Sequence, residues 1–458
     1  MIGSQSLNSL AQNLNPTVKE ALIEFSSIST DTRSLKKGDC YIALIGDRFD
    51  GNDFLEVAAA SGAVAVICSR AVDIKIPSLV VENTQLTLSA IAKENRVRSG
   101  ATLIALTGSQ GKTSVKEMLG LILSRNGKTL TTKANLNNTI GVPLTLIELT
   151  GEEKFAVVEM GANAKGEIAR SVDVTKPNIA LITNANSAHL DGFGSYEGIV
   201  QAKGEIIDGL GRDGVAVLNA NQKSCDKWVE RAGSKTVRLF SYGMRNKSAD
   251  YQCSLARFNP AGDISFDLFC PQGELSITWP LLGEHNVENA LAAAACALES
   301  GVSLEHVKEG LMRMRPIPGR LYSNKGINSC TVIDDTYNAS PSSFHAAINV
   351  LASQGSEETD RTILVVGDML ELGGKAEMFH KRLGAEARSA GITDLWAIGV
   401  FADSIVKSFG AGGVSYDQIE DVSAECVKAA QPGVIFLAKG SRGSRMERVV
   451  DVLMVTDN

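Results

Sequence analysis

Short apolar runs alternate with helix-like segments along nearly the whole chain. In the first part, runs at residues 40–45, 63–67 and 78–81 surround an amphipathic segment at residues 53–61. The polar residues 82–85 that follow mark a first boundary, which we place after residue 84. Strands that alternate with helices are typical of parallel sheets, so the pattern predicts an α/β fold.

The same alternation continues in two further parts of the chain. Strands are expected at residues 103–107, 155–159, 178–183 and 214–218, before an alanine-rich helix at residues 286–300. Pro316 and Pro318 cannot continue a helix, and they mark a second boundary after residue 314. Beyond it, strands are expected at residues 330–334, 362–367, 394–399 and 433–439. Three domains are therefore predicted, at residues 1–84, 85–314 and 315–458.

The strongest motif follows the strand at residues 103–107. The sequence G-S-Q-G-K-T-S starts at Gly108, and the apolar spacing over residues 115–122 predicts a helix from about Lys112. Backbone N–H groups and the positive dipole end of such a helix bind anions. We therefore expect phosphate to bind at this loop, with Lys112 at the β- and γ-phosphates and the Thr113 hydroxyl on a magnesium ion. The loop is shorter than the standard motif G-x-x-x-x-G-K-[ST].

A second glycine motif does not carry the same meaning. Residues 209–214 match G-x-G-x-x-G, the dinucleotide fingerprint, which works between a strand and a following helix. Here a helix-like run precedes the motif and an apolar run at residues 215–218 follows it. We interpret these residues as a turn.

Three polar residues follow strands or helices of the same central segment. Glu159 ends an apolar run, and the carboxyl end of a parallel strand faces the ligand crevice, so its carboxylate is a candidate magnesium ligand. His189 follows the next predicted strand and is a second candidate. Lys203 is a surface lysine by default, but beside a nucleotide–metal site its pKa would fall. A neutral lysine can react with carbon dioxide to give a carbamate, which is an anionic oxygen ligand.

Composition narrows the class of protein. Hydrophobic residues make up 44% and charged residues 21% of the 458 residues, and the net charge is −7, so a nucleic-acid partner is not expected. Residues 1–20 lack a basic start followed by an apolar run, so no signal peptide is expected, and the longest apolar stretch, residues 290–298, is too short to span a membrane. Eight scattered cysteines without a CxxC pair fit reduced thiols. We expect a cytoplasmic protein, and a monomer.

Taken in order, these motifs resemble those of the Mur ligase family. The family's short loop T-G-x-x-G-K-[ST] matches residues 107–113, its G-x-H-N-x-x-N matches residues 283–289, and its D-x-Y segment matches residues 335–337. The resemblance covers the whole chain and implies a small α/β uridine-nucleotide domain, a central P-loop ATPase-like domain and a C-terminal Rossmann-like domain. It implies ATP and Mg²⁺ as cofactors, with Thr113, Glu159, His189 and carbamylated Lys203 as metal ligands.

The resemblance also assigns binding residues. The implied ATP contacts are Gly108, Ser109, Gln110, Gly111, Lys112, Thr113, Ser114, His285, Asn286, Asn289, Arg320, Asp335 and Asn338. The implied substrate contacts are Ser29, Asp31, Thr32, Arg33, Phe49, Asp50, Asn137, Asn138, Lys439, Ser441 and Arg442. Many relatives read D-S-R where this chain has Asp31, Thr32 and Arg33, and the hydroxyl is kept.

Three stretches are similar to the members that add a dipeptide. They are residues 335–341, 367–373 and 135–144, and the D-N-P-R signature of diaminopimelate-adding members is absent. The implied reaction joins D-alanyl-D-alanine to UDP-N-acetylmuramoyl-tripeptide through an acyl phosphate, with Lys112, Glu159, His189 and Lys203 as the catalytic set. This step belongs to the synthesis of peptidoglycan precursors.

Two alternatives remain open from the sequence. One is another ligase of the family, such as a folylpolyglutamate-type or amino-acid-adding enzyme. The other is a P-loop switch, although the guanine-reading N/T-K-x-D of GTPases is absent. The third residue of the tripeptide and the extent of domain closure are not encoded in any motif that we recognise.

Overall fold

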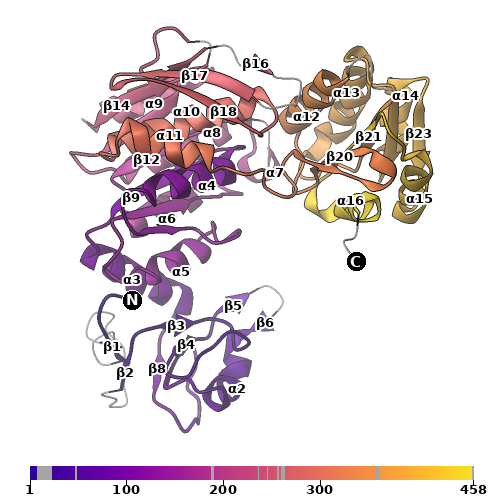
Figure 1. Cartoon of the computed structure of the whole chain (residues 1–458). Helices are drawn as coiled ribbons and strands as arrows, with labels where there is room; N and C mark the ends of the chain where they lie inside the picture. The colour runs from indigo at the N-terminus through magenta and orange to yellow at the C-terminus, as the bar shows by residue number, and fades with distance from the viewer. Residues whose placement is uncertain are drawn as a thin grey trace.

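The computed structural model describes residues 1–7, 23–46, 49–186, 190–235, 237–244, 246–254, 257–258, 264–355 and 361–455. Three α/β domains follow one another along the chain, and Figure 1 shows the first below the central one and the third beside it. The predicted α/β class with largely parallel sheets is confirmed.

The first domain is built on a parallel sheet with the order β3 (Ile28–Ser29), β4 (Cys40–Ile42), β7 (Ala65–Cys68), β8 (Ser78–Val80). A short helical stretch, η1 (Gly51–Phe54) and α2 (Leu55–Ala60), lies between β4 and β7. Two antiparallel pairs flank the sheet, β1 (Gln5–Ser6) with β2 (Glu24–Phe25) and β5 (Ile45–Gly46) with β6 (Phe49–Asp50). The strand expected at residues 40–45 is divided, because the chain leaves the buried sheet after Ile42 and Ile45 is 58% exposed in the hairpin.

The central domain contains a six-stranded, fully parallel sheet. Its order is β10 (Thr129–Thr131), β11 (Phe155–Glu159), β9 (Thr102–Thr107), β12 (Ile179–Ile182), β13 (Val215–Asn219), β14 (Arg238–Tyr242). One face is covered by α3 (Thr84–Arg98), α5 (Gly141–Ile147), α6 (Glu167–Thr175) and α8 (Tyr196–Asp208). The other face is covered by α4 (Lys112–Leu123), α10 (Glu284–Glu299) and α11 (Leu304–Met312). The remaining helices of this domain are α7 (Leu190–Phe193) and α9 (Cys225–Gly233).

An antiparallel sheet that the sequence analysis did not predict extends the central domain. It contains β15 (Gln252–Cys253), β16 (Arg257–Phe258), β17 (Ile264–Cys270) and β18 (Gly273–Trp279). Alternate residues of β17 and β18 are buried, and they pack with the cluster around α10. Residues 209–214 form a turn between α8 and β13, so the rejection of the dinucleotide fingerprint is confirmed.

The third domain has a six-stranded sheet with one antiparallel edge. Its order is β19 (Tyr322–Lys325), β20 (Thr331–Asp335), β24 (Val434–Lys439), β21 (Arg361–Val366), β22 (Asp394–Ile398), β23 (Gly413–Tyr416), and only β19 in this order runs against its neighbour. Helices α12 (Pro341–Gln354), α13 (Ala376–Ser389) and α14 (Ala402–Phe409) pack on one face, and α15 (Ile419–Ala429) and α16 (Glu447–Leu453) on the other.

The first and central domains share an apolar core, whereas the third domain has its own. One cluster is continuous from the first domain into the central one, so Ile42 and Ile67 belong to the same core as Leu88 and Ile91 of α3. The third domain has separate clusters on its two sheet faces, and Leu282 joins one of them from the central domain. Within the described ranges, no helix has the length and apolar character needed to cross a membrane.

Candidate active site

The loop between β9 and α4 requires glycine at two positions. Gly108 has a φ of 158° and Gly111 a φ of 79°. A Cβ atom on Gly108 would lie 1.8 Å from the Thr183 hydroxyl, and one on Gly111 would lie 2.3 Å from Asn289 Oδ1. The backbone can therefore approach its neighbours closely, and α4 begins at Lys112 as predicted. The N–H groups of the first turn, which includes the buried Ser114, have no acceptor within the helix, and such groups can bind an anion.

The segment that follows β12 holds this loop in place. Ser109 N donates to the Asn184 carbonyl at 3.1 Å, and Asn186 N donates to Ser109 Oγ at 3.0 Å. The Lys112 ammonium folds back and donates to the Gly108 carbonyl at 2.7 Å. Burial lowers the pKa of Lys112, and the carboxylate of Glu159 opposes that shift. The Lys112 ammonium and the backbone N–H groups at the start of α4 thus lie around the same loop, and these are the kinds of donor that bind a phosphate.

Glu159 connects the phosphate loop with two other segments. Thr113 Oγ1 donates to Glu159 Oε2 at 3.1 Å, and Asn137 Nδ2 donates to Glu159 Oε1 at 2.8 Å. From the start of the third domain, Arg320 Nη2 donates to Thr113 Oγ1 at 3.0 Å while its guanidinium lies 4.2 Å from the Tyr337 ring centroid. Thr113 and Glu159, predicted from separate motifs, are therefore in direct contact.

Lys203 on α8 is a buried lysine. It is 3% exposed, and its ammonium lies 5.7 Å from the centroid of the Phe193 ring. Among the residues that the structure describes, no carboxylate forms an ion pair with it. Burial, with a smaller contribution from Lys112, lowers the pKa of Lys203 to about 7. A large share of this amine is neutral near pH 7, which is the form that reacts as a nucleophile.

The first turn of α10 faces the phosphate loop. Asn289 approaches Gly111, and its Nδ2 donates to Asn286 Oδ1 at 3.3 Å. Asn286 Nδ2 in turn donates to the Leu282 carbonyl at 2.8 Å. Burial and, to a smaller extent, the positive charge of Lys439 lower the pKa of His285 to about 4, so the imidazole is neutral at pH 7. Because Lys439 acts on His285 and Leu282 packs in an apolar cluster of the third domain, this end of α10 lies where the third domain meets the central one.

In the third domain, a buried ion pair lies at the ends of β20 and β24. Lys439 Nζ donates to Asp335 Oδ2 at 2.6 Å and to the Asn338 carbonyl at 2.9 Å. Lys439 is 2% exposed, and burial raises the pKa of Asp335 while Lys439 opposes the shift. Ser441 Oγ accepts from Leu370 N at 2.9 Å, whereas Arg442 is exposed.

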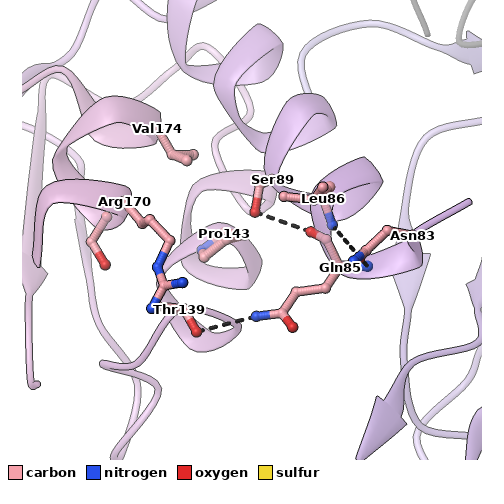
Figure 2. A pocket seen from close by; sticks show the side chains of 9 residues that line it. Asn83, Gln85, Leu86, Ser89, Thr139, Pro143, Arg170 and Val174 are labelled. Atoms are coloured by element: carbon pink, nitrogen blue, oxygen red, sulfur yellow. Dashed lines mark hydrogen bonds between the residues drawn. The ribbon is translucent and has the colours of Figure 1, made fainter. Parts of the chain in front are cut away.

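A pocket of about 180 Å³ lies between α3, α5 and α6. Gln85 Nε2 donates to Thr139 Oγ1 at 3.1 Å across it, and Figure 2 shows the Arg170 guanidinium directed toward the same threonine. Arg170 is exposed, and no carboxylate of the described chain forms an ion pair with it. The lining residues are Asn83, Gln85, Leu86, Ser89, Thr139, Pro143, Arg170, Ser171 and Val174. Thr139 lies two residues after Asn137, which donates to Glu159, so one lining residue of the pocket is close in sequence to the Glu159 network.

Comparison with known proteins agrees with this arrangement. Residues 24–108 match the model described as Mur ligase family, catalytic domain, residues 106–297 match the Mur ligase middle domain, and residues 319–442 match the Mur ligase, glutamate ligase domain. The chain belongs to the Mur ligase family.

Individual relatives of this Mur ligase are similar over the full length. The UDP-N-acetylmuramoyl-tripeptide–D-alanyl-D-alanine ligase of Escherichia coli (strain K12) is 41% identical, with 98% of each chain covered. A crystal structure of MurF from Acinetobacter baumannii superposes with a TM-score of 0.91 at 34% identity, over 98% of each chain. MurF from Thermotoga maritima in complex with ADP superposes with a TM-score of 0.83 at 25% identity, over 93% of this chain and 96% of that chain.

The residues expected to contact a uridine nucleotide gather in the first domain of this Mur ligase. Ser29 Oγ donates to the Asp31 carbonyl at 2.9 Å, and Arg33 pairs with Asp31 at 2.6 Å on an exposed turn that includes Thr32. Asp50 accepts from Arg70 at 2.7 Å beside Phe49, which is 57% exposed. Burial raises the pKa of Tyr41, and the carboxylates of Asp31 and Asp50 raise it further, so both motifs lie near this residue.

The structure brings some of the predicted site residues together and places others elsewhere. It brings Gly108, Gly111, Lys112, Thr113, Glu159, Asn289 and Arg320 together around one loop. The Asn138 side chain instead binds the backbone just before α5, since its Oδ1 accepts from Ile140 N at 3.1 Å and from Gly141 N at 2.8 Å. Predicted His189 lies outside the described residues.

Sequence reasoning missed Gln85 and Arg170, and it singled out Thr139 only as part of the stretch at residues 135–144. No motif marks Arg170, because an arginine on an amphipathic helix normally faces solvent. Its position becomes informative only when the packing of α3, α5 and α6 forms the pocket.

Proposed function

We propose that this Mur ligase uses ATP to join D-alanyl-D-alanine to UDP-N-acetylmuramoyl-tripeptide. The observation that carries the proposal is the 41% identity over 98% of both chains with the E. coli ligase of that name. The predicted catalytic set, Lys112, Glu159, His189 and Lys203, is consistent with it where the chain is described, because Lys112 and Glu159 contact the same loop and Lys203 is buried nearby.

The phosphate loop suits a nucleoside triphosphate. Gly108 and Gly111 leave no room for a Cβ atom, and the start of α4 presents free N–H groups beside Lys112. Asn286, Asn289 and Arg320 border the same space, and we assign them, with His285, Asp335 and Asn338, to the nucleotide. Backbone donors and a lysine neutralise crowded phosphate charge at the moment of transfer.

The residues around Glu159 fit a magnesium ion. Mg²⁺ binds proteins through one or two carboxylates and keeps waters and substrate phosphates as its other ligands. Thr113 and Glu159 supply a hydroxyl and a carboxylate, and no cluster of three or more His, Cys, Asp and Glu side chains is needed or found in the described parts. We assign Thr113 and Glu159 to one ion and His189 with carbamylated Lys203 to a second. Bound there, magnesium would neutralise charge on the transferring phosphoryl group.

The pocket beside Asn137 is our candidate for the peptide of the acceptor. An exposed guanidinium without an ion pair in the described chain recognises a carboxylate through two parallel hydrogen bonds. Leu86, Pro143 and Val174 offer apolar contacts, while Gln85 and Thr139 offer polar ones. We assign Arg170 to a peptide carboxylate that does not react, because this anchor directs the neighbouring carboxylate toward Glu159 and the phosphate loop.

The reaction follows from these positions. An oxygen of the acceptor carboxylate attacks the γ-phosphorus of ATP, the bond to the β-phosphate oxygen breaks, and ADP leaves an acyl phosphate. The dipeptide amine then attacks the carbonyl carbon, the carbon–oxygen bond to phosphate breaks, and the nitrogen loses a proton. Positioning of the reactants, and Lys112 beside the phosphates, contribute most of the catalysis.

We assign the dipeptide carboxylate to the segment that contains Lys439, Ser441 and Arg442. In this arrangement Lys439 contacts Asp335 and Ser441 contacts Leu370, so the exposed Arg442 is the group best placed to bind it. The uridine nucleotide is assigned to Ser29, Asp31, Thr32, Arg33, Phe49 and Asp50. Action as a monomer in the cytoplasm, in peptidoglycan precursor synthesis, completes the proposal.

The test is kcat/KM for several amines with UDP-N-acetylmuramoyl-tripeptide and ATP. D-alanyl-D-alanine should be used well, and D-alanine, L-alanine and meso-diaminopimelate poorly, because a site built around buried hydrogen bonds rejects analogues that leave its groups unpaired. Sustained ADP formation over many turnovers should require acceptor and amine together. Better use of diaminopimelate with the shorter UDP-N-acetylmuramoyl-dipeptide would reassign the chain to another member, and ADP formation without either substrate would favour a nucleotide switch.

A further inference from the structure

Gln110 belongs to the phosphate loop, but its side chain is directed toward the third domain. Its Nε2 donates to Ser340 Oγ at 2.7 Å and to Ser342 Oγ at 2.9 Å, more than 200 residues along the chain. Ser340 and Ser342 lie at the N-terminus of α12. The first turn of α12 is thereby hydrogen-bonded to the loop that surrounds the phosphates.

The backbone of Gln110 is fixed to the central domain. Its N–H donates to Asn184 Oδ1 at 2.9 Å, and its carbonyl accepts from Thr183 Oγ1 at 2.7 Å. Its side-chain Oε1 accepts from Asn186 Nδ2 at 3.4 Å, which turns Nε2 toward the serines. The Gln110 side-chain amide thus accepts a hydrogen bond from the central domain through Oε1 and donates hydrogen bonds to the third domain through Nε2.

The helix does not need Gln110 for its own capping. Ser340 Oγ accepts from Ser343 N at 3.3 Å, and Ser340 N donates to Ser343 Oγ at 2.9 Å, which completes a capping box without the glutamine. Ser342 is one residue past Pro341 and takes no part in the box. The contacts from Gln110 are therefore additional to those that stabilise α12.

We propose that Gln110 is a positioning residue that aligns the third domain with the phosphate loop. This alignment places the amine in position to attack the carbonyl carbon of the acyl phosphate. The proposal rests on the proposed function, and it concerns the second step, attack by the amine. Lys439 binds the Asn338 carbonyl two residues before Ser340, and Arg320 binds Thr113, so docking of α12 sets the residues on the third-domain side of the site.

The test is a double-mutant cycle with Gln110→Met and Ser342→Ala in the full chain. Methionine keeps the length of glutamine and removes its hydrogen bonds, and Ser342→Ala leaves the capping box in place. Gln110→Met should lower kcat/KM for the amine about tenfold, as loss of two neutral hydrogen bonds implies. Ser342→Ala removes one of these two bonds and should lower it less, and the double variant should fall no further than Gln110→Met. Ser353→Ala is the matched control, because Ser353 Oγ bonds only to the Val350 carbonyl of the same helix among the described contacts.

Three measurements separate positioning from other roles. The Kd for ATP should stay within about twofold of wild type, and equal losses in ATP affinity and in amine kcat/KM would make Gln110 a nucleotide contact instead. If the losses in kcat/KM of the two single variants add in the double variant, Gln110 and Ser342 are not coupled and the proposal is overturned. The radius of gyration with a non-hydrolysable ATP analogue alone should be larger in Gln110→Met than in wild type, because the contacts that hold α12 against the phosphate loop are lost, and equal values would overturn the docking. This last measurement needs neither turnover nor acceptor, so it tests the docking even if the proposed substrates prove wrong.

Discussion

Lys439 Nζ and Asp335 Oδ2 form an ion pair at 2.6 Å, and both residues are buried at the carboxyl ends of adjacent parallel strands. Removal of one partner leaves the other charge without compensation, so Lys439→Met should lower the free energy of unfolding by about 3–5 kcal/mol. Urea unfolding measures this loss. The paired variant Lys439→Met with Asp335→Asn should recover most of it, and equal losses in both variants would contradict the prediction.

The same pair predicts a pH dependence. Burial raises the folded-state pKa of Asp335 above its ordinary value, so without Lys439 the folded protein holds a proton more tightly than the unfolded chain. The loss in free energy of unfolding caused by Lys439→Met should therefore be greatest above the folded-state pKa of Asp335. This loss should shrink as the pH falls through that pKa. A deficit that grows as the pH falls would show that Asp335 is not its source.

Lys112→Ala should abolish ligation and leave the fold intact. The ammonium lies over the phosphate loop and donates to the Gly108 carbonyl, and it is not part of an apolar core. Activity and the circular dichroism spectrum should be measured on the same preparation. Activity within tenfold of wild type, about 1.4 kcal/mol of barrier, would rule out the phosphate role.

Lys203 should carry carbon dioxide as a carbamate. Its pKa of about 7 means that the neutral, reactive amine increases as the pH rises from 6 to 8, so carbamylation should increase over that interval. The carbamate signal from labelled carbon dioxide, followed by carbon NMR, measures this without turnover. Lys203→Ala should lose the signal and most activity, and a small added carboxylate should restore part of the activity. Full activity in this variant would end the proposal.

One acceptor oxygen should end in inorganic phosphate. The acyl phosphate route transfers an oxygen of the tripeptide carboxylate to the phosphoryl group, and attack by the amine then releases it. With an oxygen-18-labelled carboxylate, mass spectrometry should find the label in phosphate. Label in ADP or in water would exclude the route.

Arg170→Ala should raise the KM for the acceptor at least tenfold and leave the Kd for ATP unchanged, because a charge-assisted hydrogen bond contributes about 1.5–3 kcal/mol. Steady-state kinetics with each substrate varied in turn provide the measurement. Arg212→Ala, an exposed arginine in the turn before β13, is the matched control. If the Kd for ATP changes by the same factor as the KM for the acceptor, Arg170 is not a specific contact of the acceptor.

The phosphate loop could be predicted because its signal is local. The glycines, the lysine and the start of α4 depend on backbone geometry within a few residues, and the structure has the helix begin at Lys112. Strands such as Phe155–Glu159 were equally evident as buried apolar runs. The contact between Thr113 and Glu159 followed from the rule that parallel strands end at one edge.

Other features depend on packing between distant segments. The alternation of buried and exposed residues in β17 and β18 is a hairpin signal that could have revealed the antiparallel sheet. The Arg170 pocket and the contact of Gln110 with Ser340 have no such signal, because each requires three helices or two domains to be placed first. Lys439 was expected at the dipeptide, whereas its burial with Asp335 could not be read from a lysine at a strand end.

The continuous core of the first and central domains has a consequence for how affinity is distributed between substrates. The candidate sites for the uridine nucleotide and the acceptor peptide both lie on this single packed body, so the acceptor half is preorganised and little conformational entropy is lost when it fills. The amine half depends on a separate body that is joined through Leu282 and a few polar contacts. With the substrates in these candidate sites, the entropic cost of assembling the site falls on binding of the amine, and this favours an enzyme in which the amine is committed only after the acceptor is in place.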